Sequence, residues 1–542
     1  MRPSATALGI GLRTIECGVY YGVVGDSRSK ESGGVVEVSV DRLDFESVVA
    51  VARRGAPVTM SEEARERILA SRRHVEGIID EERPVYGLTT GFGALATTHI
   101  PTPERRELQH SVLRSHAAGA GPFVEPEVVR AMMVIRAKTL ATGFSGVEVD
   151  LVEALIVFLN EGLIPAVPEH GSLGASGDLA PLAHVGLCLT GEGWVLEEGE
   201  VIPAREALEK ARLEPVRLRT KEGLALINGT DGMLGMLILA LEDLELLLKT
   251  ADVTTAMSVE ALLGTDRVFR EELHAVRPHP GQMSSASNLY KLLEGSSIVA
   301  SHRDSTHLVQ DAYSLRCAPQ VYGAARDTWG FAVEIAEREL FSTTDNPIVL
   351  PDGRVESTGN FHGEPLAFAL DFLAIAASEV GAITERRIDR MLDPTRSQGL
   401  PAFLSPRAGT NSGFMISHYT AASLAEENRR LAAPASVGSL PASAMQEDHN
   451  SMGWSAARKL RTVLENLRRI LAVEALCAAQ ALELRAPLEP GPATSSVLKR
   501  IRRDIAFMNK DRFLAPDLRK AEELVRTGEL ARSAGEAIGA LE

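Results

Sequence analysis

The chain has 542 residues, of which 45% are hydrophobic and 24% are charged, a balance typical of a globular protein. Its formal net charge is −16, which argues against nucleic acid or an anionic membrane as a partner. This length exceeds that of one typical domain, so we expect two or more lobes that share a large core.

The N-terminal segment, residues 1–34, carries an apolar stretch broken by Arg13 and Glu16. It lacks the basic start of a signal peptide, and we interpret it as a loose N-terminal extension whose order the sequence leaves open. Alternating residues over 35–40 then predict a strand. Ser61 opens a capping-box-like sequence, which predicts a helix that continues to about residue 79.

Helical periodicity dominates the remainder of the chain. It predicts helices at 103–117, 125–142, 147–161, 232–263, 317–340, 363–393, 411–430 and 454–484. Several exceed the average helix length, and aromatic residues make up only 5% of the chain, which favours a helical bundle. Asp371 and Glu379 interrupt the apolar run at 365–380, so we expect no transmembrane segment.

These patterns predict a mainly α fold with a central bundle of long helices and a smaller N-terminal lobe. We expect four parts, which are the extension 1–34, an N-terminal lobe 35–230, a central bundle 231–485 and a C-terminal helical segment 486–542. Short loops rich in glycine, proline and serine connect the helices, and on such a frame they usually carry the chemistry. They are expected at 86–102, 168–182, 276–288, 341–365 and 400–412.

The four cysteines are Cys17, Cys188, Cys317 and Cys477. They are far apart and show no spacing typical of a metal site, so we expect four buried thiols and no metal. Few, scattered cysteines also favour a reduced, cytoplasmic location.

The segment Gly171-Ser-Leu-Gly-Ala-Ser-Gly-Asp-Leu-Ala-Pro181 can build an electrophile from its own backbone. The amide nitrogen of Gly177 can attack the carbonyl of Ala175 and close a five-membered ring, because glycine leaves this approach unhindered. Loss of that water and of the Ser176 hydroxyl as a second water would leave a methylidene-imidazolone. The alternative is a glycine-rich turn in which Ser176 or Asp178 caps the next helix.

These eleven residues resemble the cyclising segment of the histidine and aromatic amino-acid ammonia-lyases. Seven further motifs follow the order of that family, and together they are far more specific than any one of them. They are Tyr86-Gly-Leu-Thr-Thr-Gly-Phe-Gly93, Ser115-His-Ala-Ala-Gly119, Asn228-Gly-Thr230, Gln310-Asp-Ala-Tyr-Ser-Leu-Arg316, Asn360-Phe-His-Gly-Glu364, Asn411-Ser-Gly-Phe-Met415 and Gln446-Glu-Asp-His449. The resemblance runs from about residue 35 to the C-terminus.

The resemblance implies a fumarase/aspartase-like superfold and a homotetramer whose active sites are shared between chains. It also implies that a methylidene-imidazolone formed from Ala175-Ser176-Gly177 replaces any external cofactor. A fumarase-like lyase is an alternative, but Gly295-Ser-Ser-Ile298 lacks the residues that follow in the catalytic loop of those enzymes. A catalytically silent scaffold is a further alternative, which the filled catalytic positions disfavour.

The reaction implied is removal of ammonia from an α-amino acid, which requires a base for a proton of low acidity. Tyr86 resembles that base, although the reference pKa of a phenol is about 10. Arg316 resembles the residue that holds the substrate carboxylate, and a guanidinium suits this role. By the same resemblance Tyr313 places a hydroxyl near the substrate amine, and Gln310 is a further polar ligand.

Two more residues complete the catalytic set by resemblance. Asn228 corresponds to a contact of the prosthetic ring or the substrate carboxylate, and Phe361 to an aromatic that packs on the electrophile. Ordinary structural roles are the alternatives, namely an Asx cap for Asn228 and a core position for Phe361.

Three residues indicate the substrate by their resemblance to the histidine branch of the family, namely His116, Met415 and Glu447. A carboxylate facing the substrate ring suits an imidazole N–H and is poorly matched to a bare phenyl ring. The expected small substrate is therefore L-histidine, and the expected product is urocanate.

A tyrosine or phenylalanine ammonia-lyase, or a 2,3-aminomutase using the same electrophile, is the alternative. Thr89, Met445 and Asn450 differ from the residues usual in the histidine branch. The segment 115–119 is also similar to that of some tyrosine aminomutases.

Overall fold

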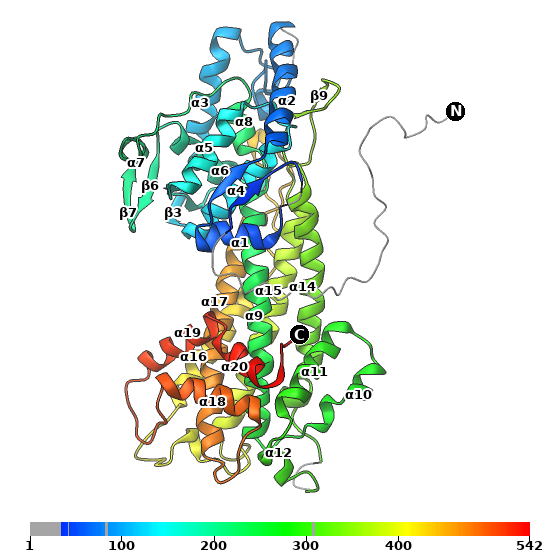
Figure 1. Ribbon diagram of the computed structural model, residues 1–542, viewed down its shortest axis with the longest axis vertical. Coiled ribbons are helices and arrows are strands. Elements are labelled where there is room, and N and C mark those ends of the chain that lie inside the picture. The colour runs from blue at the N-terminus through cyan, green and yellow to red at the C-terminus, as the bar shows by residue number, and fades with distance from the viewer. Residues whose placement is uncertain (1–33, 42, 82–84, 306–308) are drawn as a thin grey trace, which may run out of the picture.

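The computed structural model describes residues 34–41, 43–81, 85–305 and 309–542. The extension expected over 1–34 lies outside the described residues except for Gly34. The described chain is mainly helical and elongated, with an N-terminal lobe at one end, long helices through the middle and a group of shorter helices at the other end (Figure 1). The predicted fold class is confirmed.

The centre of the molecule is a bundle of long helices that pack side by side (Figure 1). They are α9 (Asp231–Ala261), α14 (Ala318–Phe341), α15 (Glu364–Leu392), α16 (Met415–Leu431) and α17 (Gly453–Glu483). Helices of 31 residues, such as α9 and α17, are about 45 Å long because each residue adds about 1.5 Å. The expected boundary after residue 230 falls immediately before α9.

The start of α16 differs from the prediction, which placed it at residue 411. Residues Asn411–Gly413 instead form a turn in which the amides of Ser412 and Gly413 donate to the Asp511 carboxylate, at 2.7 and 3.0 Å. Because Gly413 has a φ of +57°, the backbone there is left-handed and the helix begins only at Met415.

The N-terminal lobe combines helices with short strands. Its strands are β1 (Val36–Val38), β2 (Val58–Met60), β3 (Ala120–Phe123), β4 (Ile164–Pro165), β5 (Pro168–His170), β6 (Trp194–Glu197) and β7 (Glu200–Pro203). Its helices are α1 (Phe45–Arg54), α2 (Glu62–Glu81), α3 (Arg105–His116), α4 (Pro126–Ala141), α5 (Val149–Asn160), α6 (Leu179–Leu189), α7 (Ala204–Ala211) and α8 (Glu222–Ile227). As the capping sequence predicts, the Ala64 amide donates to Ser61 Oγ at 3.2 Å where α2 begins.

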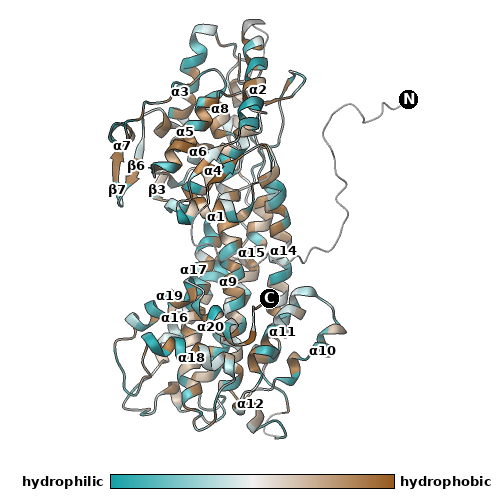
Figure 2. Cartoon of the chain, viewed as in Figure 1, coloured by the Kyte–Doolittle hydropathy of each residue, from teal (hydrophilic) through white to brown (hydrophobic). Residues whose placement is uncertain are grey.

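The strands form small sheets that join the helices of the lobe. β1 pairs in parallel with β2, with Val36 opposite Val58, which confirms the strand expected at 35–40 in shorter form. β3 pairs antiparallel with β5, and β4, β6 and β7 form an antiparallel sheet in that order. Helices α5 and α6 are largely hydrophobic (Figure 2) and are covered by the elements around them.

The other end of the molecule holds most of the remaining elements. They are α10 (Glu271–Ala275), α11 (Pro280–Leu293), α12 (Ser297–Ser301), α13 (Tyr313–Arg316), α18 (Pro492–Asp504), α19 (Ala515–Arg526) and α20 (Glu529–Ile538), while the hairpin β8 (Ile348–Val349) and β9 (Val355–Glu356) lies against the N-terminal lobe. The loop predicted at 276–288 was wrong, because α11 occupies most of it. Pro280 stands in the first turn of α11, where its missing N–H costs nothing, and Gly281 lets α11 approach Gly323 of α14.

One hydrophobic cluster runs through both the N-terminal lobe and the bundle, so the two parts share a core. Among the described residues, α15 is the one helix long and apolar enough to cross a membrane. Most of its apolar stretch is buried, and within it Asp371 pairs with Lys459 and accepts the amides of Ala435 and Ser436 at 3.1 and 2.8 Å. These contacts identify α15 as a core helix of the bundle.

The cysteines differ in burial, whereas the sequence analysis predicted that all four are buried. Cys188 and Cys477 are buried, and burial raises the pKa of each thiol. Cys317 is partly exposed, because it lies between α13 and α14 rather than inside a packed helix, so the expectation that every cysteine is buried was wrong. Cys17 lies outside the described residues.

Candidate active site

The residues expected to form the site divide into two groups at opposite ends of the long bundle. The first group, at the N-terminal lobe, is Tyr86, His116, Ala175, Ser176, Gly177, Asn228, Phe361 and Glu447. The second, at the opposite end, is Gln310, Tyr313, Arg316 and Met415.

The segment 171–177 is a tight turn whose conformation requires glycine. Gly174 and Gly177 have φ angles of +67° and +77°. Gly177 pairs with Gly229, and the Asp178 amide donates to Gly229 O at 2.7 Å. A Cβ at Gly177 would lie 2.1 Å from that same carbonyl oxygen. Position 177 therefore excludes a side chain both by its backbone angle and by the space around it.

The other side of the turn is held by the segment that leads into α17. The Met452 amide donates to Leu173 O at 2.9 Å, and Ser451 Oγ donates to Gly174 O at 3.2 Å. Ala175 is buried, whereas Ser176 is partly exposed. The turn is thus clamped between residues 228–229 and 451–452, with the serine side chain accessible.

Asp178 does not cap α6, the role considered for it from sequence. Its Oδ2 accepts the amides of Gly232 and Met233, both at 2.9 Å, in the first turn of α9. Burial raises the pKa of this carboxyl to about 8, against the opposing effect of the two amides. Asp178 therefore joins the glycine turn to the start of α9, where the positive end of the helix dipole favours a negative charge.

Asn228 is buried next to the turn, and both its side chain and its backbone form hydrogen bonds. Its Nδ2 donates to Asn346 O at 3.4 Å, and its own carbonyl accepts from Arg136 Nη1 at 2.9 Å. The same guanidinium forms a buried ion pair with Asp231 at 2.8 Å. These contacts fix the backbone that pairs with Gly177.

A second buried ion pair supports the same region. Lys221 Nζ lies 2.6 Å from Asp345 Oδ2, and both side chains are fully buried. Burial lowers the pKa of Lys221, against the opposing charge of Asp345. The sequence analysis missed this pair and Arg136. Arg136 is a charged residue within the otherwise apolar helical stretch 131–137, and this was a usable signal for it. Lys221, by contrast, lies in a charged run that is typical of a surface.

Tyr86 lies in a loop that packs on the same region. Its hydroxyl oxygen accepts the Gly93 amide at 3.1 Å, and its ring meets Phe92 edge-on, with centroids 6.5 Å apart. A Cβ at Gly87 would lie 2.5 Å from Leu224 in α8. The tyrosine loop is therefore seated on the helix that immediately precedes Asn228.

The segment carrying Glu447 contacts both the tyrosine loop and the glycine turn. A Cβ at Gly93, in the tyrosine loop, would lie 2.8 Å from Ser443 Oγ. A few residues after Ser443, Ser451 Oγ donates a hydrogen bond to Gly174 O in the glycine turn. Within the segment, the Ala442 amide donates to Glu447 O at 2.9 Å. Glu447 is partly buried, and this burial raises the pKa of its carboxyl.

His116 and Phe361 belong to the same end of the molecule. His116 is the last residue of α3, its Nδ1 lies 3.0 Å from Ser115 Oγ, and burial lowers its pKa. The following segment touches the glycine turn, since a Cβ at Gly171 would lie 3.1 Å from Gly119 Cα. Phe361 is partly exposed and lies just before α15, where Gly363 packs against Met233 of α9.

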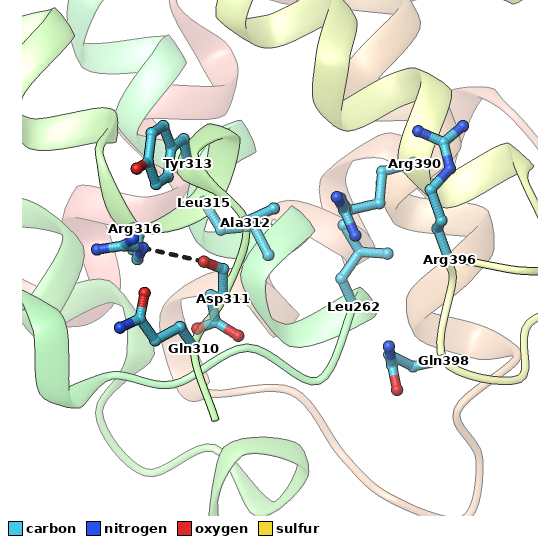
Figure 3. Close-up of a pocket in the computed structure, with 10 residues that line it drawn as sticks. All are labelled: Leu262, Gln310, Asp311, Ala312, Tyr313, Leu315, Arg316, Arg390, Arg396 and Gln398. Atoms are coloured by element: carbon cyan, nitrogen blue, oxygen red, sulfur yellow. Dashed lines mark hydrogen bonds between the residues drawn. The ribbon is translucent and has the colours of Figure 1, made fainter. Parts of the chain in front are cut away.

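Three residues of the second group, Gln310, Tyr313 and Arg316, line a cavity of about 330 Å³ at the far end of the bundle (Figure 3). As predicted, Tyr313 and Arg316 share one helical turn, and the Arg316 guanidinium lies 4.7 Å from the centroid of the Tyr313 ring. Arg316 Nε also donates to Asp311 O at 3.0 Å. Gln310 lines the same cavity, whose other side carries Arg390, Arg396 and Gln398.

The distance between the two groups of site residues follows from the length of α9. Asn228 lies three residues before α9 begins, and Leu262, which lines the Arg316 cavity, follows its last residue. The two ends of a 31-residue helix are about 45 Å apart. Met415, at the start of α16, is also at the far end, since His418 in its first turn contacts Glu385 near the end of α15. One chain alone cannot bring Arg316 to Ser176.

The chain is similar to known proteins over most of its length. A profile of the family described as aromatic amino acid lyase matches residues 43–503. The chain is 54% identical over 508 residues to a histidine ammonia-lyase of Streptomyces avermitilis, covering 93% of this chain and 99% of that protein.

Solved structures are similar over almost the same length. The tyrosine aminomutase of Streptomyces globisporus is 38% identical with a TM-score of 0.89, covering 94% of this chain and 100% of that one. A histidine ammonia-lyase of Trypanosoma cruzi is 39% identical with a TM-score of 0.86, covering 93% and 96%.

Proposed function

The chain belongs to the aromatic amino acid lyase family, and from this premise we propose that it eliminates ammonia from L-histidine to give urocanate. One observation carries the choice of substrate. His116 and Glu447 resemble the imidazole-binding residues of the histidine branch. Through Gly119 and Ser451, the segments that hold them both contact the turn 171–177, which contains Ala175-Ser176-Gly177. Relatives named histidine ammonia-lyase at 54% identity support the same choice.

The turn fits the methylidene-imidazolone that we propose as the prosthetic group. Among the described residues no hydrogen bond engages the Gly177 amide nitrogen, so this nitrogen is available to attack the Ala175 carbonyl. The contacts on both sides of the turn restrain the backbone of the three residues that would form the ring. When formed, the group supplies an electrophile for the substrate amine.

The side chains of the lobe then act on the substrate itself. We assign Tyr86 as the base for the β-proton, because the residue is half-buried at this end of the molecule and its hydroxyl is oriented by the Gly93 amide. The Glu447 carboxylate would accept the imidazole N–H. His116, whose pKa is lowered by burial, is neutral near pH 7 and can donate or accept toward the same ring.

Arg316 must come from another copy of the chain if it is to hold the substrate carboxylate, and we propose a homotetramer with shared active sites. The approximately 45 Å between the ends of α9 supports sharing. A second support is an exposed apolar face on the bundle, formed by Phe331 of α14 with Phe368, Phe372 and Ile375 of α15, each 41–44% exposed. A contiguous apolar face of this kind marks a contact surface.

The test of the substrate is a panel of histidine, tyrosine and phenylalanine with product absorbance as the readout. We expect urocanate to form fastest. Faster formation of coumarate or cinnamate would refute the choice of histidine. The similarity to tyrosine aminomutase keeps a second candidate, a 2,3-aminomutase acting on tyrosine, and a β-amino acid product would identify it.

We also propose a cytoplasmic location. The three cysteines among the described residues, Cys188, Cys317 and Cys477, are all free thiols, which suits a reducing compartment. Fractionation of cells followed by an activity assay would test this.

A further inference from the structure

We propose that His362, Glu364 and His449 form a binding site for one divalent transition-metal ion, for which Zn²⁺ is the best match. Each of these residues offers one ligand atom, and the three atoms lie within 4.8 Å of one another. The sequence analysis predicted no metal from the spacing of the cysteines. It did not consider these three residues as a site, because His449 is far along the chain from the other two.

The orientation of His362 is that of a metal ligand. Its Nε2 lies 3.2 Å from the backbone oxygen of His449, close enough to donate to it. Donation from Nε2 leaves the lone pair on Nδ1, and Nδ1 lies on the side of Glu364, 3.9 Å from its Oε2. Metal-bound histidines commonly use one ring nitrogen for the ion and donate the other N–H to a backbone carbonyl in this way.

Glu364 provides an independent indication. Its Oε2 is buried and has no hydrogen-bond partner among the described residues. An unsatisfied buried carboxylate oxygen is costly, and it calls for an ion or a water molecule. The 3.9 Å between this oxygen and His362 Nδ1 is too long for a hydrogen bond. It is close to the roughly 3.4 Å that separates two ligands sharing one tetrahedral Zn²⁺.

The chemistry of the ligands selects the class of ion. Two imidazoles and one carboxylate suit Zn²⁺ and related transition metals, whereas Mg²⁺ and Ca²⁺ prefer oxygen ligands alone. The N-terminus of α15, where Glu364 stands, is unfavourable to a cation, and the carboxylate offsets this with its own negative charge. Three protein ligands leave one tetrahedral position for water.

The ion would join two segments of the proposed active site without taking part in the elimination. His362 follows Phe361 directly, and His449 lies two residues after Glu447. A metal that binds both histidines would hold the Phe361 loop against the Glu447 loop. This role goes beyond the proposed function and does not depend on which amino acid is the substrate.

The test is equilibrium dialysis of the full-length protein, stripped with a chelator, against Zn²⁺, with metal per chain measured by mass spectrometry. We expect one Zn²⁺ per chain, and at least tenfold weaker binding in His362→Gln and in His449→Gln. The matched control is His279→Gln, which changes an exposed histidine at the start of α11 and should bind as the unaltered protein does. Absence of binding, or equal binding in all three variants, would overturn the proposal.

Glu364→Gln keeps the side-chain shape and guards against a variant that merely misfolds. It should match the circular dichroism of the unaltered chain, lose Zn²⁺ at least tenfold and change the visible absorption of bound Co²⁺. Unchanged Zn²⁺ affinity in this folded variant would also overturn the site. Failure of the proposed function is separable, because a chain that binds Zn²⁺ but turns over tyrosine in place of histidine refutes only the substrate.

Discussion

Gly177 and Gly229 lie back to back, so closely that a methyl group on Gly177 would meet the Gly229 carbonyl oxygen at 2.1 Å. We predict that Gly177→Ala loses activity and the absorbance of the mature prosthetic group. The added carbon collides with backbone that Arg136 holds in place, and it also forces a left-handed residue. The measurement is an absorbance spectrum and a thermal melt of the purified variant.

Gly199→Ala is the matched control for this prediction. Gly199 has a φ of +88° in the turn between β6 and β7 and has nothing within 4 Å of its Cβ position. It should cost only the strain of a left-handed residue, about 1–2 kcal/mol, and keep full activity. Equal loss of activity in both variants would mean that the Gly229 contact has no special role.

The sequence predicted the long helices and the glycine-rich turn, because both depend on neighbouring residues. Apolar periodicity located α9, α15 and α17, and the turn was identified by its own eleven residues. What it could not predict depends on contacts between distant segments. The hydrogen bond from Ser451 to Gly174 and the ion pair of Lys221 with Asp345 join residues far apart in the chain, so no local pattern predicts them. Pro280 and Gly281 indicated a loop, but Pro280 begins α11 and Gly281 lets α11 pack closely on α14.

Lys221→Met should destabilise the protein by about 3–5 kcal/mol, because it leaves the Asp345 carboxylate buried without its counter-charge. Replacing both partners, as in Lys221→Met with Asp345→Leu, should recover a large part of that loss. Denaturant midpoints measure both effects. Lys210→Met removes exposed ion pairs with Glu197 and Glu206 and should leave the denaturant midpoint almost unchanged. A loss from Lys221→Met as small as this would show that the buried pair is dispensable.

Glu447 should shape the acid side of the pH dependence. Burial raises the pKa of its carboxyl above the ordinary 4.5, and only the ionised form accepts an imidazole N–H. Activity on histidine should therefore be present above that raised pKa and be lost as the pH falls through it. The ratio of kcat/KM between the unaltered enzyme and Glu447→Gln cancels the titration of histidine itself. That ratio should fall toward one at acid pH, and a ratio independent of pH would assign Glu447 a structural role.

The apolar face on α14 and α15 should be covered by another copy of the chain. Phe372 lies at its centre, 6.0 Å from the Phe331 ring and 6.1 Å from the Phe368 ring, measured between centroids. Phe372→Lys should yield a smaller, folded and inactive species in size-exclusion chromatography. Phe513→Lys, at an isolated aromatic that is 79% exposed, should remain tetrameric and active. A tetrameric Phe372→Lys would place the assembly surface elsewhere.

Shared active sites can be tested by mixing two inactive chains, since Tyr86 and Arg316 lie at opposite ends of the bundle. Co-expressed Tyr86→Phe and Arg316→Met chains should regain up to about a quarter of full activity, because random mixing gives that share of sites both intact groups. Tyr86→Phe mixed with Ser176→Ala should regain none, because the contacts of both segments place them at the same end of one chain. Mass spectrometry would show that the tetramers contain both chains. If such mixed tetramers of Tyr86→Phe and Arg316→Met regain no activity, Arg316 would have to act within its own chain. The approximately 45 Å length of α9 makes that incompatible with a substrate held at Ser176.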